Sequence, residues 1–165
     1  MNRSRATFPR VSAWDRPGFL LWHAVLRWQR AAAAALAPTG LTHTQFRMLT
    51  SIVWLQEHEG YDPSQRDVAE HMGIDTMVTS QVVRTLARGG LVERLGDERD
   101  ARVRRLQVTA EGRTLALQAI DIIEALDDDF FGTGELRETS IVALRELAGR
   151  NDRGEVVDPR WPRGG

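Results

Sequence analysis

The chain contains no cysteine, which excludes disulfide bridges and a thiol redox sensor. It also contains no lysine, so all 22 basic side chains are arginine. No apolar run is long enough to cross a bilayer, and Met1 to Asp15 lacks the apolar segment of a signal peptide. These absences predict a soluble, cytoplasmic protein without membrane contact. Its 165 residues suffice for one domain with its own core.

Residue patterns typical of enzymes and metal sites are also missing. We find no Gly-rich phosphate loop, no nucleophile beside a base and no recognisable pair of catalytic carboxylates. The histidines lack metal-ligand spacing and no acid cluster accompanies them: His23, His43, His58 and His71. The sequence therefore predicts no catalytic residues, no metal and no cofactor.

The charge of the chain is unevenly distributed. A net charge of -1 does not by itself favour nucleic-acid binding. Residues 84–105, however, contain seven arginines and four acids. The planar guanidinium group of arginine can donate two parallel hydrogen bonds to a phosphate or to guanine. A GC-rich genome would also enrich arginine, and arginines occur in both terminal segments, so local charge permits DNA binding without establishing it.

Residues 64–88 have the pattern of two short helices joined by a tight turn. Ser64 and Asp67 form a capping box, and Gly73 suits the positive φ of a helix end. Asp75 caps the second helix. Its apolar stripe has helical spacing: Thr79, Val82, Val83 and Leu86. The opposite face carries Met77, Ser80, Gln81, Arg84 and Arg88, flanked by Thr76 and Val78. This acid-free face suits insertion into a DNA major groove, although it also fits an ordinary solvated surface.

A β-hairpin is expected after these helices. Residues 91–95 and 103–108 alternate as strands do. The charged turn between them holds Asp97, Arg99, Asp100 and Arg102. Thr109 then caps a further helix. The simplest interpretation of such a turn is a solvated hairpin tip; the alternative is a contact with nucleic acid.

Apolar helices flank this central part. Helical spacing of apolar residues predicts helices over residues 17–37, from 42 to about 55, 113–131 and 135–147. Residues 57–63 are expected to form a connecting loop with a short extended piece. The first of these helices is so apolar that it is expected to pack against another apolar helix.

Residues 97–112 carry the most specific motif in the chain. Residues 97–102 read Asp-x-Arg-Asp-x-Arg and are followed by VTAEG at 108–112. Together with Gly-Ile-Asp at 73–75 and the Leu, Gly, Leu, Val spacing over 86–92, they resemble the MarR-type transcriptional regulators. The resemblance extends from about Pro17 to Gly149.

This resemblance implies a mainly α fold with a small two- to three-stranded β wing, a winged helix-turn-helix whose dimerisation helices come from both termini. The implied organisation is a flexible arm at 1–16, dimerisation helices at 17–41 and 113–149, a DNA-binding region at 42–112 and a disordered tail at 150–165. The absence of cysteine excludes the cysteine-based peroxide sensors of the family.

The function implied is that of a homodimeric repressor that binds a pseudo-palindromic site in double-stranded DNA and is released by a small aromatic effector. The candidate DNA-binding residues are Ser64, Gln65, Thr76, Met77, Val78, Ser80, Gln81, Arg84, Arg99 and Arg102, with Asp97 and Asp100 supporting the wing. The family often has Ser or Thr near Met77 and Arg at Gln81. These two departures leave the operator sequence open.

A ligand site is implied by the same resemblance, because MarR-like proteins form a cavity between the dimerisation and DNA-binding parts. The candidates on the first two helices are Trp22, His23, His43, Arg47 and Trp54. Core packing explains each tryptophan equally well. Two other functions stay open: a dimeric protein-interaction module that has lost DNA reading, and a ligand-independent architectural DNA binder.

Overall fold

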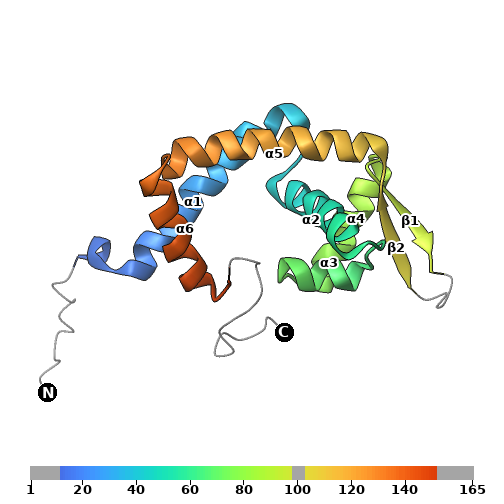
Figure 1. The fold of residues 1–165 in the computed structure, drawn as a ribbon, viewed down its shortest axis with the longest axis horizontal. Helices are drawn as coiled ribbons and strands as arrows, with labels where there is room; N and C mark the ends of the chain where they lie inside the picture. The colour runs from blue at the N-terminus through green and yellow to red at the C-terminus, as the bar shows by residue number, and fades with distance from the viewer. Residues whose placement is uncertain (1–11, 98–102, 152–165) are drawn as a thin grey trace, which may run out of the picture.

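The computed structural model describes residues 12–97 and 103–151 and has the shape of an arch. Helix α5 (Ala110–Phe131) forms the span (Figure 1). One end holds η1 (Ala13–Asp15), α1 (Pro17–Leu36) and α6 (Glu135–Ala148). The other end holds α2 (His43–Glu59), α3 (Gln65–Met72), α4 (Thr76–Arg88), β1 (Val92–Gly96) and β2 (Arg104–Val108), while η2 (Ala37–Thr39) joins α1 to α2. The predicted fold class is confirmed.

The wing is a two-stranded antiparallel sheet. Its register runs from Val92 opposite Val108 to Gly96 opposite Arg104. An isolated bridge between Ser64 and Arg105 adds a third, very short extended segment. This segment ties the wing to the start of α3, as the predicted extended piece before that helix required.

Helices α2, α3, α4 and α5 begin where their capping residues predict. The N-cap side chains accept from backbone amides: Thr42 from Gln45, Ser64 from Asp67, Asp75 from Met77 and Val78, and Thr109 from Gly112. Each such cap stabilises its helix by about 1 kcal/mol. Local side-chain chemistry therefore fixes the start of each of these helices.

The core lies around α2, which packs against α3, α4, α5 and β2. Met48, Leu49 and Ile52 on α2 are fully buried, as is Leu106 on β2. Where α1 crosses α5, small residues such as Ala32 and Ala119 are fully buried, so the two helices approach closely. One contiguous core therefore connects α2, α3, α4 and the wing to α5 and α1.

The start of α5 is locked onto the turn before the wing. The Leu91 carbonyl accepts from the Thr109 amide at 3.1 Å, and the Thr109 hydroxyl donates to the Gly90 carbonyl at 2.8 Å. A Cβ at Gly112 would lie only 2.1 Å from the Leu91 carbonyl oxygen. Glycine at this position lets α5 touch the backbone that leads into β1.

One helix end and two predicted region boundaries differ from the sequence prediction. Helix α2 continues to Glu59, beyond the predicted start of a loop at residue 57, because Gly60 provides the left-handed terminus with φ 71°. Helix α5 begins at Ala110, so the predicted boundary between residues 112 and 113 lies inside one helix. The arm expected over 1–16 overlaps η1. Within η1, the centroid of the Trp14 ring lies 5.0 Å from that of the Phe19 ring.

Within residues 12–97 and 103–151, no helix has the length and apolar character needed to cross a membrane.

Candidate nucleic-acid interface

Helix α4 presents one face to solvent and buries the other. Thr79, Val83 and Leu86 are buried, which confirms the predicted stripe. The opposite face is open, with Met77 79% and Val78 46% exposed. Large apolar side chains this exposed at the start of a surface helix are suited to contact with a partner.

The remaining candidates on α4 share this open face. Thr76, Gln81 and Arg84 are exposed, and Ser80 is half-buried. No acidic residue occurs in the first turn of α4. The charge at this end of the helix is therefore set by the positive end of the helix dipole and by the Asp75 carboxylate at the N-cap. The sequence-predicted candidates on this helix thus lie together on one accessible surface.

Ser64 and Gln65 lie at the start of α3, and Ser64 has a structural task. Its hydroxyl accepts from the Asp67 amide at 3.2 Å, and its own amide donates to the Asp67 carboxylate at 2.8 Å. Gln65 is half-buried beside it. The capping box therefore occupies the acceptor side of the Ser64 hydroxyl, which leaves its proton for a partner.

Arg105 on β2 connects the wing to the rest of the DNA-binding end. Its Nε donates to the Asp97 carboxylate at 2.5 Å, and its guanidinium also donates to the Asp62 carbonyl at 3.3 Å. The same group lies 3.6 Å from the Asp67 carboxylate and over the Tyr61 ring. The hydrogen bond to Asp97 raises the pKa of Arg105 above its ordinary value, so the charge of this hub is permanent.

The sequence assigned Asp97 and Asp100 to the support of the wing arginines. Among the described residues, Asp97 binds Arg105, which the sequence did not single out. Asp100, Arg99 and Arg102 lie outside the described residues. The sequence does not predict the role of Arg105, because its partner Asp62 is 43 positions away and comes close only in the folded chain.

A groove of about 620 Å³ runs between the C-terminal half of α4 and β1. It is lined by Gln81, Arg84, Ala87, Arg88 and Arg94. Gln81 and Arg84 were sequence-predicted candidates, whereas Arg88 and Arg94 were not. Helical spacing does place Arg88 beyond Arg84 on the exposed face, but the packing of β1 against α4 is what adds Arg94.

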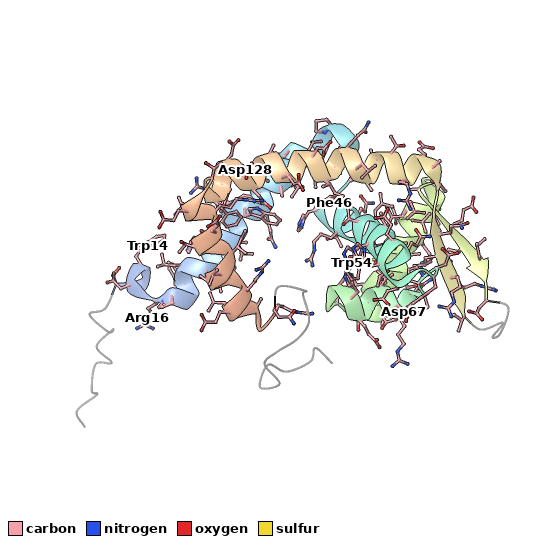
Figure 2. The ribbon with its side chains drawn as sticks, in the orientation of Figure 1. Trp14, Arg16, Phe46, Trp54, Asp67 and Asp128 are labelled. Atoms are coloured by element: carbon pink, nitrogen blue, oxygen red, sulfur yellow. The ribbon has the colours of Figure 1, made fainter. Side chains whose placement is uncertain are left out.

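The five ligand candidates do not form one cluster, which corrects the sequence-based grouping. Trp22 and His23 pack with Trp14 and Phe19 at the start of α1; the Trp22 and His23 rings are 4.8 Å apart. In Figure 2, the labelled Trp14 lies at the opposite end of the arch from Trp54. Further along α1, the Trp28 ring instead meets the His43 ring at the start of α2.

His43 is half-buried and packs against aromatic rings of α1 and α2. Its ring meets Trp28 edge-on at 4.9 Å and lies 6.3 Å from Phe46. Trp28 is fixed by a 2.8 Å hydrogen bond from its Nε1 to the Asp127 carboxylate on α5. The Nε2 atom of His43 is buried and has no hydrogen-bond partner among the described residues. Such an atom is unusual in a folded protein and marks a place for a missing partner.

Trp54 stacks with two histidines further along α2. Its ring centroid is 4.3 Å from His58 and 4.8 Å from His71, with nearly parallel planes. Loss of solvent around the ring lowers the pKa of His71, and the charges of Arg150 and Arg47 lower it further. Arg47 also lowers the pKa of His43, so its charge acts on both sites.

His43 should make stability depend on pH. Burial, and then the charge of Arg47, lower its pKa below 6.5, so the unfolded chain binds this proton more readily than the folded one. The free energy of unfolding is therefore expected to fall as pH drops from about 7.5 to about 5. Urea unfolding of the wild type and His43→Phe at both pH values checks this. An equal pH dependence of the two proteins would contradict it.

Within the described ranges, no three His, Asp or Glu side chains gather in a way that would hold a metal ion.

Comparisons with known proteins agree with this geometry. Residues 39–125 match the family described as ArnR1-like, winged-helix domain. The HTH-type transcriptional regulator YdcH of Bacillus subtilis is 38% identical over 131 residues, which cover 79% of this chain and 88% of the relative.

Solved structures with a similar fold include the following two. CouR from Rhodococcus jostii RHA1, bound to p-coumaroyl-CoA, superposes with a TM-score of 0.71 at 29% identity, covering 84% of this chain and 92% of that one. A MarR family protein of Mycobacterium tuberculosis in complex with DNA has a TM-score of 0.63 at 25% identity, covering 80% and 97%.

Proposed function

Because the chain belongs to the MarR family of winged helix-turn-helix transcriptional regulators, we propose that it is a homodimeric repressor released from DNA by a small aromatic ligand. The observation that carries the proposal is the open, acid-free face of α4 beside an arginine-lined groove. Two such faces on one symmetric dimer would address successive major grooves of a pseudo-palindromic site. The family is one of DNA-binding regulators, and we propose no catalytic role and a cytoplasmic location.

Base reading is assigned to the first half of α4. Gln81 is exposed and able to pair through both amide atoms with adenine. Met77 and Val78 are apolar and exposed, which suits a thymine methyl group. In the wing, Arg102 with Arg99 is assigned to the minor groove, where negative potential attracts guanidinium groups. In this proposal α4 recognises the base sequence, and the wing adds affinity for DNA.

A second copy of the chain is the proposed partner of α1 and α6. Helix α6 buries no residue, although Leu136, Leu144 and Leu147, which are 64%, 40% and 63% exposed, share one side of the helix by their spacing. On α1, Trp22 and Val25 are exposed at the same end of the arch. An apolar surface of this extent is characteristic of an interface between subunits.

We expect the double substitution Leu144→Glu and Leu147→Glu to yield monomers. Two carboxylates in the proposed interface would each need desolvation without a counter-charge. Light scattering after gel filtration should give half the wild-type mass, with the helical circular dichroism retained. Val78→Glu on α4, an exposed apolar residue outside the proposed interface, should remain dimeric. A double variant with the wild-type mass would remove α6 from the interface.

The ligand is proposed to bind around His43. The unpartnered Nε2 atom, the Trp28 and Phe46 rings and the positive charge of Arg47 favour a planar aromatic compound with an acidic group. Ligand binding would favour a dimer whose α4 helices no longer match the groove spacing. DNA affinity would then fall by the factor with which the ligand distinguishes the two states.

Fluorescence anisotropy with labelled DNA from upstream of the coding sequence tests the function. We expect saturable binding at low salt that is reversed by an aromatic acid such as a hydroxybenzoate or hydroxycinnamate. Failure of the folded dimer to bind at low salt would instead favour the protein-interaction module. Binding that no aromatic acid or phenol reverses would favour the architectural DNA binder.

A further inference from the structure

The groove between α4 and β1 has basic side chains on both of its walls. Arg84 and Arg88 come from α4, and Arg94 comes from β1. All three side chains are exposed. Arginines from two different elements thus converge on one hollow of about 620 Å³.

The charges of these three arginines are uncompensated in the part of the chain that the structure describes. None of the three takes part in a salt bridge there, whereas Arg66, Arg105, Arg113 and Arg137 all do. Among the described residues, the only hydrogen bond from the three groups is from Arg88 to the Thr85 hydroxyl, at 3.3 Å. Guanidinium groups held side by side without carboxylates repel one another, and an anion in the groove would relieve that repulsion.

The position of the groove identifies the anion. With α4 in a major groove and the wing tip in the neighbouring minor groove, the sugar-phosphate strand that separates the two must pass between α4 and the wing. Strand β1 packs against α4, and the arginine groove lies along that junction. The one DNA strand that has to cross this junction therefore meets the three arginines.

We propose that this groove holds the phosphodiester backbone between the two DNA grooves, with Arg84 and Arg88 on one side of it and Arg94 on the other. The proposal rests on the DNA-binding function proposed above. These contacts position the protein and add affinity without reading sequence. They account for a strong hold on DNA by a chain whose net charge is only -1.

The contact is tested by removing charge from each side in turn. Arg84→Ala and Arg94→Ala should each weaken binding to the wild-type site about tenfold at low salt, and reduce the slope of log affinity against log salt by about one. Base preference, measured on a set of single-substitution sites, should stay unchanged. Arg30→Ala on α1, which removes the same charge outside the DNA-binding end, should bind as the wild type does.

Replacing single DNA phosphates with uncharged methylphosphonates locates the contact between the groove and the DNA backbone. Methylphosphonates are placed one at a time along the half-site, and the wild type should lose affinity at one or two linkages beside the α4 major groove. At those linkages, Arg94→Ala should lose nothing further, whereas Arg30→Ala should lose as much as the wild type. This non-additivity shows that Arg94 and the neutralised phosphate belong to one contact.

Two outcomes overturn the proposal while the repressor function stands. In the first, the wild type binds its site, yet both arginine variants bind with the affinity and salt slope of Arg30→Ala. In the second, ATP binds the wild type but not Arg94→Ala and leaves DNA binding by the wild type unchanged, which would make the groove a site for a free phosphorylated molecule. A wild type that binds no DNA overturns both this proposal and the proposed function.

Discussion

Replacing Gly112 with alanine is expected to lower the free energy of unfolding by about 3 kcal/mol. The added Cβ would lie 2.1 Å from the Leu91 carbonyl oxygen and 2.9 Å from its carbon, and both are backbone atoms that cannot rotate away. Either α5 or the turn before β1 must move, which also breaks the hydrogen bond from Thr109 to Leu91. Chemical denaturation followed by circular dichroism measures the loss.

Gly18→Ala is the matched control. Gly18 also lies in the first turn of a helix, and no described atom lies within 4 Å of its added Cβ. Alanine should therefore leave stability unchanged or raise it by up to about 1 kcal/mol. Equal stability of the Gly112 and Gly18 variants would contradict the close approach of α5 to the wing.

Replacing Arg105 with methionine is expected to release the wing and weaken DNA binding about tenfold or more, with the helices intact. The Asp97 side chain is only 10% exposed and loses its 2.5 Å hydrogen bond from Arg105, and the loss of such a bond to a carboxylate costs about 1–3 kcal/mol. The bond to the Asp62 carbonyl is lost as well. Hydrogen exchange of the β1 and β2 amides should accelerate, while exchange in α5 should not change.

Arg66→Met shows what the loss of an ordinary ion pair does. Arg66 pairs with Glu70 one helical turn away on α3, and both side chains are largely exposed. Such an exposed pair contributes little to stability, because solvent screens both charges. If the Arg105 variant resembled the Arg66 variant in exchange and stability, the assignment of Arg105 as the hub of the wing would be wrong.

The predictable part of this molecule is the part governed by neighbours in the chain. Ser64, Asp75 and Thr109 cap helices through amides two or three residues away, so their role is visible in the sequence. The buried stripe of α4 follows from helical spacing for the same reason. The fold class and the exposed face of α4 accordingly follow from the amino-acid sequence.

The rest depends on contacts between distant segments. Arg105 works through Asp62 and Asp67, and Arg94 joins the α4 arginines only because β1 packs beside that helix. The tryptophan and histidine candidates are separated for the same reason. His43, at the start of α2, packs against Trp28, whereas Trp22 packs against His23 near the start of α1.

The central claim is that a symmetric pair of these chains reads DNA with two copies of α4, and hydroxyl-radical footprinting on the region upstream of the coding sequence tests it most directly. We expect one dimer to protect two half-sites whose centres are about one helical turn apart on the same face of the duplex. A folded dimer that protects no DNA at low salt, or that protects a single unpaired half-site, would contradict the claim.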